Sequence, residues 1–316
     1  MAAGGPMGGS LRTASLPCPV VELPGDIPDR PRPTVGPWHH APSCQELRAR
    51  TRALADVVDR FECHTLVTDV SMEVAVWGRL AGLRVVAVRQ SGQRDDAPHA
   101  VGLASADAVW VPQHRALEGP VEGIDERWHF TGAFSRYDDA VVQRGDGEQP
   151  RPRVHADTAA HALLVVVGAG GTSFPEERWR REHLPPGWRA TIVGLPQRWR
   201  GTHSTSLGPV PDVGAHMASA DVVITAGGWA SVAEAAACRA RTVIVPERRP
   251  FDEQLERSRA LERAGLAVTL EAWPAPADMT SLAALADQLD PSRWDRYYDG
   301  LGAQRAAALV DRVHCG

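Results

Sequence analysis

Lysine is absent from this chain of 316 residues, so all 34 of its Lys-plus-Arg positions are arginine. A nucleotide-binding P-loop needs a lysine, as does the ATP site of a protein kinase. A Schiff base with pyridoxal phosphate needs one too. The sequence therefore excludes these three mechanisms. Asparagine is also absent, which removes the acceptor of N-glycosylation.

Cysteine is scarce: the chain has five, with no pair at C-x-x-C spacing. This pattern is typical of reduced, mostly buried thiols and does not indicate a zinc site. The twelve histidines are scattered, and the only adjacent pair is His39 and His40. Adjacent histidines are poorly placed to share one metal ion, so the sequence predicts no metal site.

Long hydrophobic runs are missing as well. No apolar stretch approaches the roughly 18 residues that a membrane-spanning helix needs, and the first residues lack the apolar region of a signal peptide. The net charge of −5 argues against nucleic acid as a partner, because nucleic-acid-binding proteins usually present a basic surface. We expect a cytoplasmic protein without a transmembrane segment, long enough for two domains.

Short apolar segments alternate with segments of helical periodicity along most of the chain. Strands are expected at 64–70, 84–90, 108–111, 162–167, 189–196, 220–225 and 241–246. Helices are expected at 45–60, 72–83, 231–238, 251–264 and 295–314. This alternation is typical of parallel sheets covered by helices on both faces. We therefore predict an α/β protein with two Rossmann-like, doubly wound domains.

The segment 144–153 is polar, contains Gly and Pro, and has no apolar period, so it is the best linker in the chain. We predict an N-terminal domain over residues 1–140, a linker over 141–160 and a C-terminal domain over 161–316.

A pair of glycines, Gly227 and Gly228, ends one of the predicted strands just before a helix. Ligands of open parallel sheets bind beyond the carboxyl ends of the strands, and a helix N-terminus suits a phosphate. Ser231 and Glu234 open the helix three residues apart, which is also the pattern of a capping box. Spacing alone favours the cap.

Two other strand ends carry similar signals. The loop from Gly168 to Ser173 is rich in glycine, yet Ser173 stands where a dinucleotide fingerprint has its third glycine. The loop can hold a phosphate or a sugar, or it can be an ordinary tight turn. Further on, Asp252 and Gln254 open a helix after the strand that ends at Pro246. An acidic residue there also complements the helix dipole without any ligand.

Taken in order, these three strand–loop–helix units resemble the C-terminal half of GT-B glycosyltransferases. The sequence is most similar to the MurG-type N-acetylglucosaminyltransferases and related bacterial enzymes of glycosyltransferase family 28. The resemblance is good over residues 163–270. It is looser over 64–139, which are similar to the acceptor-side half of actinobacterial members. It is specific for the fold and the class of donor, and it does not identify the sugar.

The resemblance implies a role for each matching residue. Glu234 is expected to hold the ribose hydroxyls of the donor, while its diphosphate faces Gly227, Gly228 and Ser231. Asp252 and Gln254 are expected to contact the donor sugar. The loop that lines the cleft is expected to comprise Gly168, Gly170, Gly171 and Thr172.

The resemblance implies a donor linked to UDP or dTDP, and no metal ion or further cofactor. In this fold the helix dipole and backbone N–H groups stabilise the leaving nucleoside diphosphate. It also suggests that the last helix packs back on the N-terminal domain.

The chain departs from the family pattern in its first half. Family members usually open with a strand, a Gly-rich loop containing a histidine, and a helix, a unit that carries or positions the catalytic base. This chain shows no such opening, so we expect the first domain to be incomplete, without its first strand–helix unit. Asp69, at a strand end facing the expected cleft, is the best remaining base, and its alternative role is a helix N-cap. Asp95 and Asp96 come next.

The sequence therefore predicts a glycosyltransferase that moves a hexose-type sugar from a nucleotide-diphosphate donor to an acceptor hydroxyl. The acceptor is an unidentified small or lipid-linked molecule. Two alternatives stay open: a degenerate, non-catalytic protein that binds nucleotide sugars, and a nonhydrolysing sugar-nucleotide epimerase on the same fold.

Overall fold

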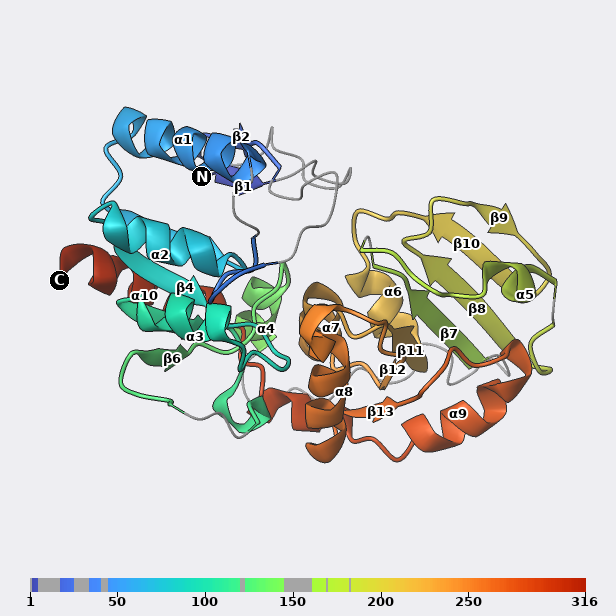
Figure 1. The fold of residues 1–316 in the computed structure, drawn as a ribbon. Helices are drawn as coiled ribbons and strands as arrows, with labels where there is room; N and C mark the ends of the chain where they lie inside the picture. The colour runs from blue at the N-terminus through green and yellow to red at the C-terminus, as the bar shows by residue number, and fades with distance from the viewer. Residues whose placement is uncertain are drawn as a thin grey trace.

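The computed structural model describes residues 2–4, 18–25, 34–40, 45–119, 123–144, 161–168, 170–181 and 183–316. Within these residues the chain forms two main parallel sheets, each covered by helices (Figure 1). The predicted α/β class is confirmed.

The first half of the chain builds a four-stranded parallel sheet in the order β3-β4-β5-β6. A small parallel pair, β1 with β2, lies apart from this sheet. The elements of this half are β1 (Ala2–Gly4), β2 (Val21–Leu23), α1 (Gln45–Arg60), β3 (Thr65–Asp69), α2 (Met72–Leu80), β4 (Arg84–Val88), α3 (Ala97–Ala104), β5 (Ala108–Val111), the 3₁₀ helix η2 (Arg115–Leu117), β6 (Trp128–Phe130) and α4 (Asp138–Arg144).

The second half builds a seven-stranded sheet in the order β13-β12-β11-β7-β8-β10-β9, parallel except for β9. Its elements are β7 (His161–Val166), α5 (Glu176–Arg181), β8 (Trp188–Val193), β9 (Trp199–Arg200), β10 (Ser204–Gly208), α6 (Gly214–Ser219), β11 (Val222–Thr225), α7 (Trp229–Ala237), β12 (Thr242–Ile244), the 3₁₀ helix η3 (Pro250–Asp252), α8 (Glu253–Arg263), β13 (Ala267–Thr269), the 3₁₀ helix η4 (Pro276–Asp278), α9 (Met279–Ala286), the 3₁₀ helix η5 (Pro291–Arg296) and α10 (Gly302–Cys315).

Strand β4 explains why both faces of the first sheet are covered. Its side chains alternate between the faces, as in any strand. Val85 and Ala87 pack into the cluster that contains Ala75 of α2, while Val86 packs against Leu309 of α10. A run of small apolar residues therefore predicts a strand that is buried on both sides. Strand β7 behaves likewise in the second sheet, where Leu163 and Leu164 belong to different core clusters.

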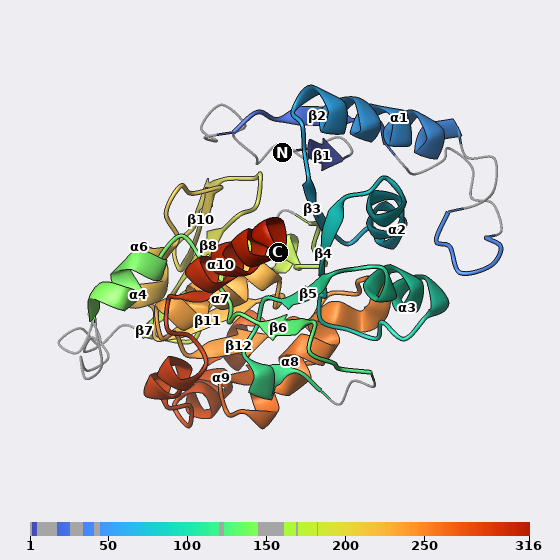
Figure 2. The ribbon, with the colours of Figure 1, turned by 90° about the vertical axis from the view of Figure 1, so that its left-hand side faces the viewer.

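Helix α10, the last element of the chain, lies against the first sheet. It contacts β3 and β4, and Figure 2 shows it beside these strands. Leu309 is 1% exposed, and Arg84 Nη1 donates a hydrogen bond to the carbonyl of Val313 at 2.9 Å. The end of the sequence thus crosses back to the half that was built first.

Several sequence-based boundaries need correction. The final helix begins at Gly302 rather than at residue 295, because residues 291–296 form η5. Helix α4 extends to Arg144, so the first residues of the predicted linker are helical, and residues 145–160 lie outside the described part. The described cysteines are free, yet none is fully buried. Among the described residues, every helix is too short or too polar to cross a membrane.

Candidate functional site

The Gly227–Gly228 turn opens helix α7. Gly227 has φ +77°, a conformation that residues with a Cβ rarely adopt, and an added Cβ lies 2.7 Å from Ile244 Cγ2. Gly228 is the N-cap of the helix, which therefore begins at Trp229 and not at Ser231. Ser231 is the third helical residue, so the capping box that the spacing favours is not formed. The first N–H groups of α7 are left without a side-chain cap.

The carboxylate of Glu234 is buried, with 7% of the residue exposed, and it makes an ion pair. Arg136, from the segment between β6 and α4, places Nη2 at 2.5 Å and Nε at 2.8 Å from Glu234 Oε1. Glu234 thus does not close its own backbone turn. The arginine belongs to the segment Thr131–Asp139 that ends the first half, so the pair connects the two halves of the chain.

The Gly-rich loop is tied to the third unit of the predicted site by one carboxylate. Glu247 Oε1 accepts hydrogen bonds from Thr172 Oγ1 at 2.9 Å and from the backbone N–H of Ser173 at 2.6 Å. The backbone N–H of Glu247 donates to Gln254 Oε1 at 3.0 Å. Gln254 in turn lies next to the Gly227–Gly228 turn. The structure therefore brings together three of the predicted units: the Gly-rich loop, the Gly-Gly turn and Gln254.

Sequence reasoning missed Glu247. Burial by itself raises the pKa of this carboxyl, but the N–H of Ser173 and the hydroxyl of Thr172 outweigh that effect, and the net pKa is lowered. Trp273 Nε1 also donates to Oε1, at 3.2 Å. A signal was present in the sequence, because Glu247 directly follows Pro246 at a strand end, where functional side chains gather.

Phe251 and Asp252 have left-handed backbone conformations, with φ of 61° and 51°. Such conformations cost about 1–3 kcal/mol each for residues other than glycine and are concentrated at functional sites. Asp252 is the N-cap residue of α8, but its side chain makes no capping hydrogen bond and is exposed. Asp252 therefore does not cap the helix by a hydrogen bond, although its charge still lies at the amino end of α8, where it complements the helix dipole.

Arg257 supplies a fixed cation beside the Gly-Gly turn. Its Nη1 donates to the carbonyl of Gly227 at 2.9 Å, and its guanidinium lies 5.2 Å from the ring centroid of Trp229. Burial lowers the pKa of Arg257 to about 10. Its Nε has no hydrogen-bond partner among the described residues. The sequence offered no specific signal for this residue.

Asp69 stands at the end of β3, in the first half. It is not a helix N-cap, because Ser71 occupies that position for α2. Its Oδ1 accepts a hydrogen bond of 2.7 Å from Gln90 Nε2. Partial loss of hydration among neighbouring atoms raises the pKa of the carboxyl, although Gln90 and Arg94 oppose this and the residue is exposed. Val70, which follows, has φ of 75°, an outlier for a β-branched residue.

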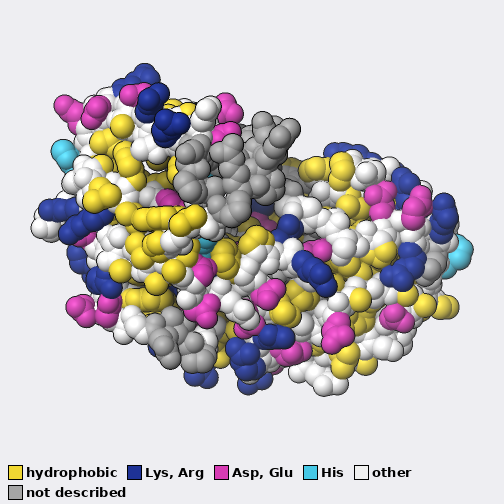
Figure 3. Space-filling view, in the orientation of Figure 1, with side chains coloured by type: hydrophobic (Ala, Val, Ile, Leu, Met, Phe, Trp, Pro, Cys, Tyr) yellow, Lys and Arg dark blue, Asp and Glu magenta, His cyan; other side chains and the backbone are white. Residues whose placement is uncertain are grey.

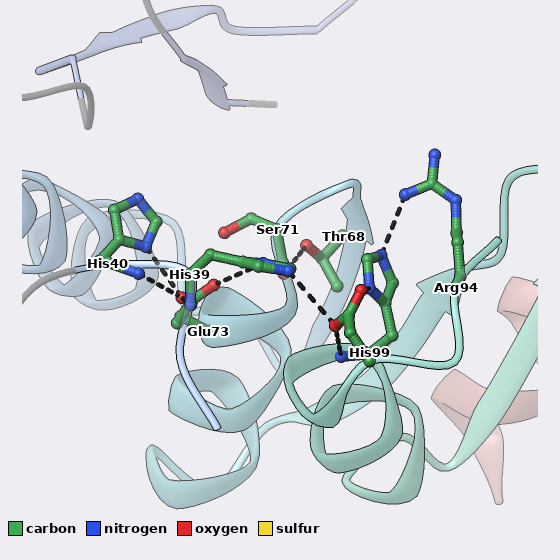
Figure 4. Close-up of polar contacts among 8 residues, drawn as sticks. His39, His40, Thr68, Ser71, Glu73, Arg94 and His99 are labelled. Carbon is green, nitrogen blue, oxygen red and sulfur yellow. Dashed lines mark hydrogen bonds and ion pairs between the residues drawn. The ribbon is translucent and has the colours of Figure 1, made fainter. Parts of the chain in front are cut away.

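A polar cluster that includes Arg94 and His99 is shown in Figure 4, and Arg94 is linked to Asp69 through Gln90. His99 Nδ1 is 2.8 Å from Asp96 Oδ2, and His39 Nε2 is 3.4 Å from Asp96 Oδ1. Arg94 Nη1 lies 2.9 Å from His99 Nε2. His39 also faces Glu73, its Nδ1 lying 3.7 Å from Oε2. Sequence reasoning named Asp96 but did not foresee that His39 and His99 meet it.

Among the described residues, His39, Asp96 and His99 are the one group with the spacing of metal ligands. Arg94 decides against that role. A guanidinium only donates hydrogen bonds, so Nε2 of His99 accepts and Nδ1 carries the proton that bonds to Asp96. A metal at Nδ1 needs the opposite tautomer. Burial also lowers the pKa of His99, which favours the neutral ring. The cluster is therefore a hydrogen-bonded network.

One cavity lies beside Trp229 and Arg257, and another lies beside His40 and Glu73. One, of about 40 Å³, lies between the halves and is lined by Trp229 and Arg257 from one side and by Gln113 and His114 from the other. It is too small for a nucleotide, since ligand pockets measure roughly 300–1,000 Å³. The other, of about 680 Å³, is apolar and lies between α1 and α2. Figure 3 shows hydrophobic side chains gathered on this half of the molecule.

The predicted donor-side units thus lie together beside the amino end of α7. Known protein families and structures contain similar units. Residues 205–290 match the model of the glycosyltransferase family 28 C-terminal domain. The match covers less than half of the chain. The matched residues include Gly227, Gly228, Ser231, Glu234, Asp252 and Gln254. Curated proteins give no match to the sequence.

Solved structures show the same fold. The glycotransferase of kitacinnamycin superposes with a TM-score of 0.59 at 18% identity, over 85% of this chain and 80% of that one. MurG of Acinetobacter baumannii gives 0.57 at 13% identity, over 94% and 85%. The spinosyn rhamnosyltransferase SpnG complexed with thymidine diphosphate gives 0.52 at 18% identity, over 86% and 75%. The fold is that of the GT-B glycosyltransferases, and together with the family 28 match over residues 205–290 it supports a glycosyltransferase.

Proposed function

We propose that this protein transfers a hexose-type sugar from a nucleotide-diphosphate donor to an acceptor hydroxyl, without a metal ion. The observation that carries the proposal is the family 28 match over residues 205–290 on a GT-B fold, with the Gly-Gly turn at the amino end of α7. The donor is linked to UDP or dTDP. The SpnG structure that contains thymidine diphosphate supports this class of nucleotide.

The diphosphate binds at the amino end of α7. The uncapped N–H groups of this helix point to an anion, and the helix dipole favours negative charge there. Gly227 and Gly228 allow close approach of the backbone, and the Arg257 guanidinium adds a fixed positive charge next to them. These groups stabilise the charge that develops on the leaving nucleoside diphosphate, which is the work that a metal ion performs in other transferases.

The remaining donor contacts come from the side chains that surround this turn. Ser231 faces the diphosphate, and Glu234 holds the ribose hydroxyls after exchanging part of its bond to Arg136. Asp252 and Gln254 contact the sugar. The side chain of Asp252 is exposed and makes no capping hydrogen bond to α8. The Gly-rich loop closes over it, held by Glu247.

Asp69 is the proposed general base. Its carboxylate removes the proton of the acceptor hydroxyl, the oxygen attacks the anomeric carbon of the sugar, and the nucleoside diphosphate departs. The raised pKa of Asp69 suits this role, because a base works best when its pKa lies nearer the operating pH. The apolar cavity between α1 and α2 accommodates the hydrophobic part of the acceptor. SpnG has been solved with the spinosyn aglycone, which supports an acceptor of this kind.

Isothermal titration with UDP and dTDP tests the donor site. We expect one of them to bind and Glu234→Ala to weaken it at least tenfold. The control is Glu256→Ala, which removes a glutamate that, within the described part of the chain, pairs only with its helical neighbour Arg259. Absence of binding by either nucleotide contradicts the proposal.

Product analysis separates the alternatives. The protein is incubated with UDP-glucose, UDP-N-acetylglucosamine or dTDP-glucose, with and without the phenolic acceptor 4-methylumbelliferone. A glycosylated acceptor supports transfer, and a rate unchanged by EDTA supports metal independence. An epimerised nucleotide sugar in the absence of acceptor indicates the epimerase. Binding without any product indicates the non-catalytic protein.

A further inference from the structure

The side chain of Phe251, from the second half, is held by three side chains of the first half. Its ring centroid lies 4.8 Å from that of His99, in an edge-on arrangement, and 5.8 Å from that of His39. The guanidinium of Arg94 lies over the ring at 4.7 Å. Edge-on aromatic pairs and cation–π contacts of this geometry are attractive. Three residues of the polar cluster in Figure 4, His39, Arg94 and His99, thus hold this aromatic ring.

The backbone of Phe251 is engaged as well. The N–H of Gln93 donates to its carbonyl at 2.8 Å. Gly92 approaches so closely that an added Cβ lies 2.4 Å from the same oxygen and 3.0 Å from Glu253 Cα. The loop after β4 therefore fits directly onto η3. The left-handed backbone at Phe251 and Asp252 occurs at this contact, where the surroundings hold it in place.

Arg94 connects this contact to both proposed reactive sides. Its Nη2 lies 3.2 Å from Gln90 Oε1, and Gln90 holds Asp69. The same nitrogen lies 3.5 Å from Glu253 Oε2, between Asp252 and Gln254 in the sequence. Arg94 is therefore linked through Gln90 to the proposed base, Asp69. It is also linked to Glu253, which lies between the two proposed sugar contacts in the sequence.

We propose that Phe251 is a positioning residue: its ring, seated among His39, Arg94 and His99, fixes the two halves in the closed arrangement that aligns Asp69 with Asp252 and Gln254. The alignment of the base with the donor rests on the proposed function. The contact of Phe251 with His39, Arg94 and His99, called the closing contact below, does not. Because the nucleoside diphosphate binds to residues of the second half, release of the ring disturbs catalysis more than nucleotide binding.

Phe251→Ala is the test, with Phe251→Tyr as the conservative variant and Phe61→Ala as a control. Phe61 is an aromatic residue stacked on Arg60 at the end of α1. Small-angle scattering of Phe251→Ala should show a larger radius of gyration than wild type, with circular dichroism unchanged. The kcat for UDP-glucose or dTDP-glucose with 4-methylumbelliferone should fall at least tenfold, while the dissociation constant of UDP or dTDP changes less than threefold. Phe251→Tyr should restore most of the kcat.

An unchanged radius of gyration in Phe251→Ala overturns the closing contact, whatever the activity. An enlarged radius with unchanged kcat overturns the alignment. If wild type turns over no nucleotide sugar, the proposed function fails, and scattering alone then decides on the closing contact. Should Phe251→Ala not fold, the same two measurements on Phe251→Leu replace it, because leucine keeps an apolar side chain without the ring.

Discussion

Arg136 Nη2 lies 2.5 Å from Oε1 of Glu234, and this ion pair joins the segment after β6 to helix α7. The pair is asymmetric, because the arginine side chain is 52% exposed while that of the glutamate is 9% exposed. The carboxylate that the family resemblance assigns to the donor ribose is thus held by a cation that solvent can reach.

Arg136→Ala leaves the carboxylate of Glu234 without its partner. We expect the free energy of unfolding to fall by about 1–2 kcal/mol, less than for a fully buried pair because water reaches the arginine. Denaturant unfolding measures this change. Titration with UDP or dTDP should show affinity within about threefold of wild type, since Glu234 remains. A tenfold weakening instead assigns Arg136 itself to the donor site.

Asp69→Asn removes the proposed base with little change in shape. We expect kcat to fall by about 10²-fold or more, a typical contribution of general acid–base catalysis, while nucleotide affinity stays the same. The acidic limb of the pH–rate profile, caused by protonation of Asp69, should disappear. Asp59→Asn, on α1, is the matched control. If Asp69→Asn keeps full activity, another group is the base.

Glu247→Ala removes the acceptor shared by Thr172, Ser173 and Trp273. Water can replace the lost acceptor for the exposed Thr172 and Ser173, so we expect the free energy of unfolding to fall by only about 0.5–1.5 kcal/mol. Hydrogen exchange should become faster in the Gly-rich loop. Glu247→Gln keeps an oxygen acceptor and should cost less. Equal loss in the two variants contradicts this account of the loop.

Glu73 should make stability depend on pH at the acidic end. Burial raises the pKa of Glu73, but the hydrogen bond from His40 and the backbone N–H groups outweigh it and lower the pKa from 4.5 to about 2. A carboxyl with a lowered pKa stabilises the folded state fully above its unfolded value of 4.5, and this contribution disappears as the pH falls toward 2. The loss amounts to at most about 3 kcal/mol.

Unfolding measured from about pH 5 down to about pH 2 tests this prediction, because this range runs from just above the unfolded pKa of 4.5 to the folded pKa of about 2. Glu73→Gln should flatten the dependence, whereas Glu126→Gln, at an exposed position, should not. An unchanged slope in Glu73→Gln shows that Glu73 does not anchor the segment of His39 and His40.

Local elements could be predicted because their signals are local. Helix α1 and strand β5 have the bounds that periodicity gives, 45–60 and 108–111. The start of α7 was predicted two residues late, because the serine–glutamate spacing imitates a cap while the structure uses Gly228. Trp229, now helical, packs against Arg257 of α8, a contact that no short window of sequence contains.

The sequence by itself determined the α/β class, the absence of lysine-dependent chemistry, and the glycine-rich strand ends at 168–172 and 227–228, since each depends on residue type and near neighbours. Only the tertiary structure decided that Glu234 pairs with Arg136, that Glu247 joins the Gly-rich loop to Gln254, and that Phe251 sits between His99 and Arg94. These partners are far apart along the chain. Their pairing depends on how the two sheets pack relative to each other, with α10 lying against the first sheet. No local sequence pattern encodes that arrangement.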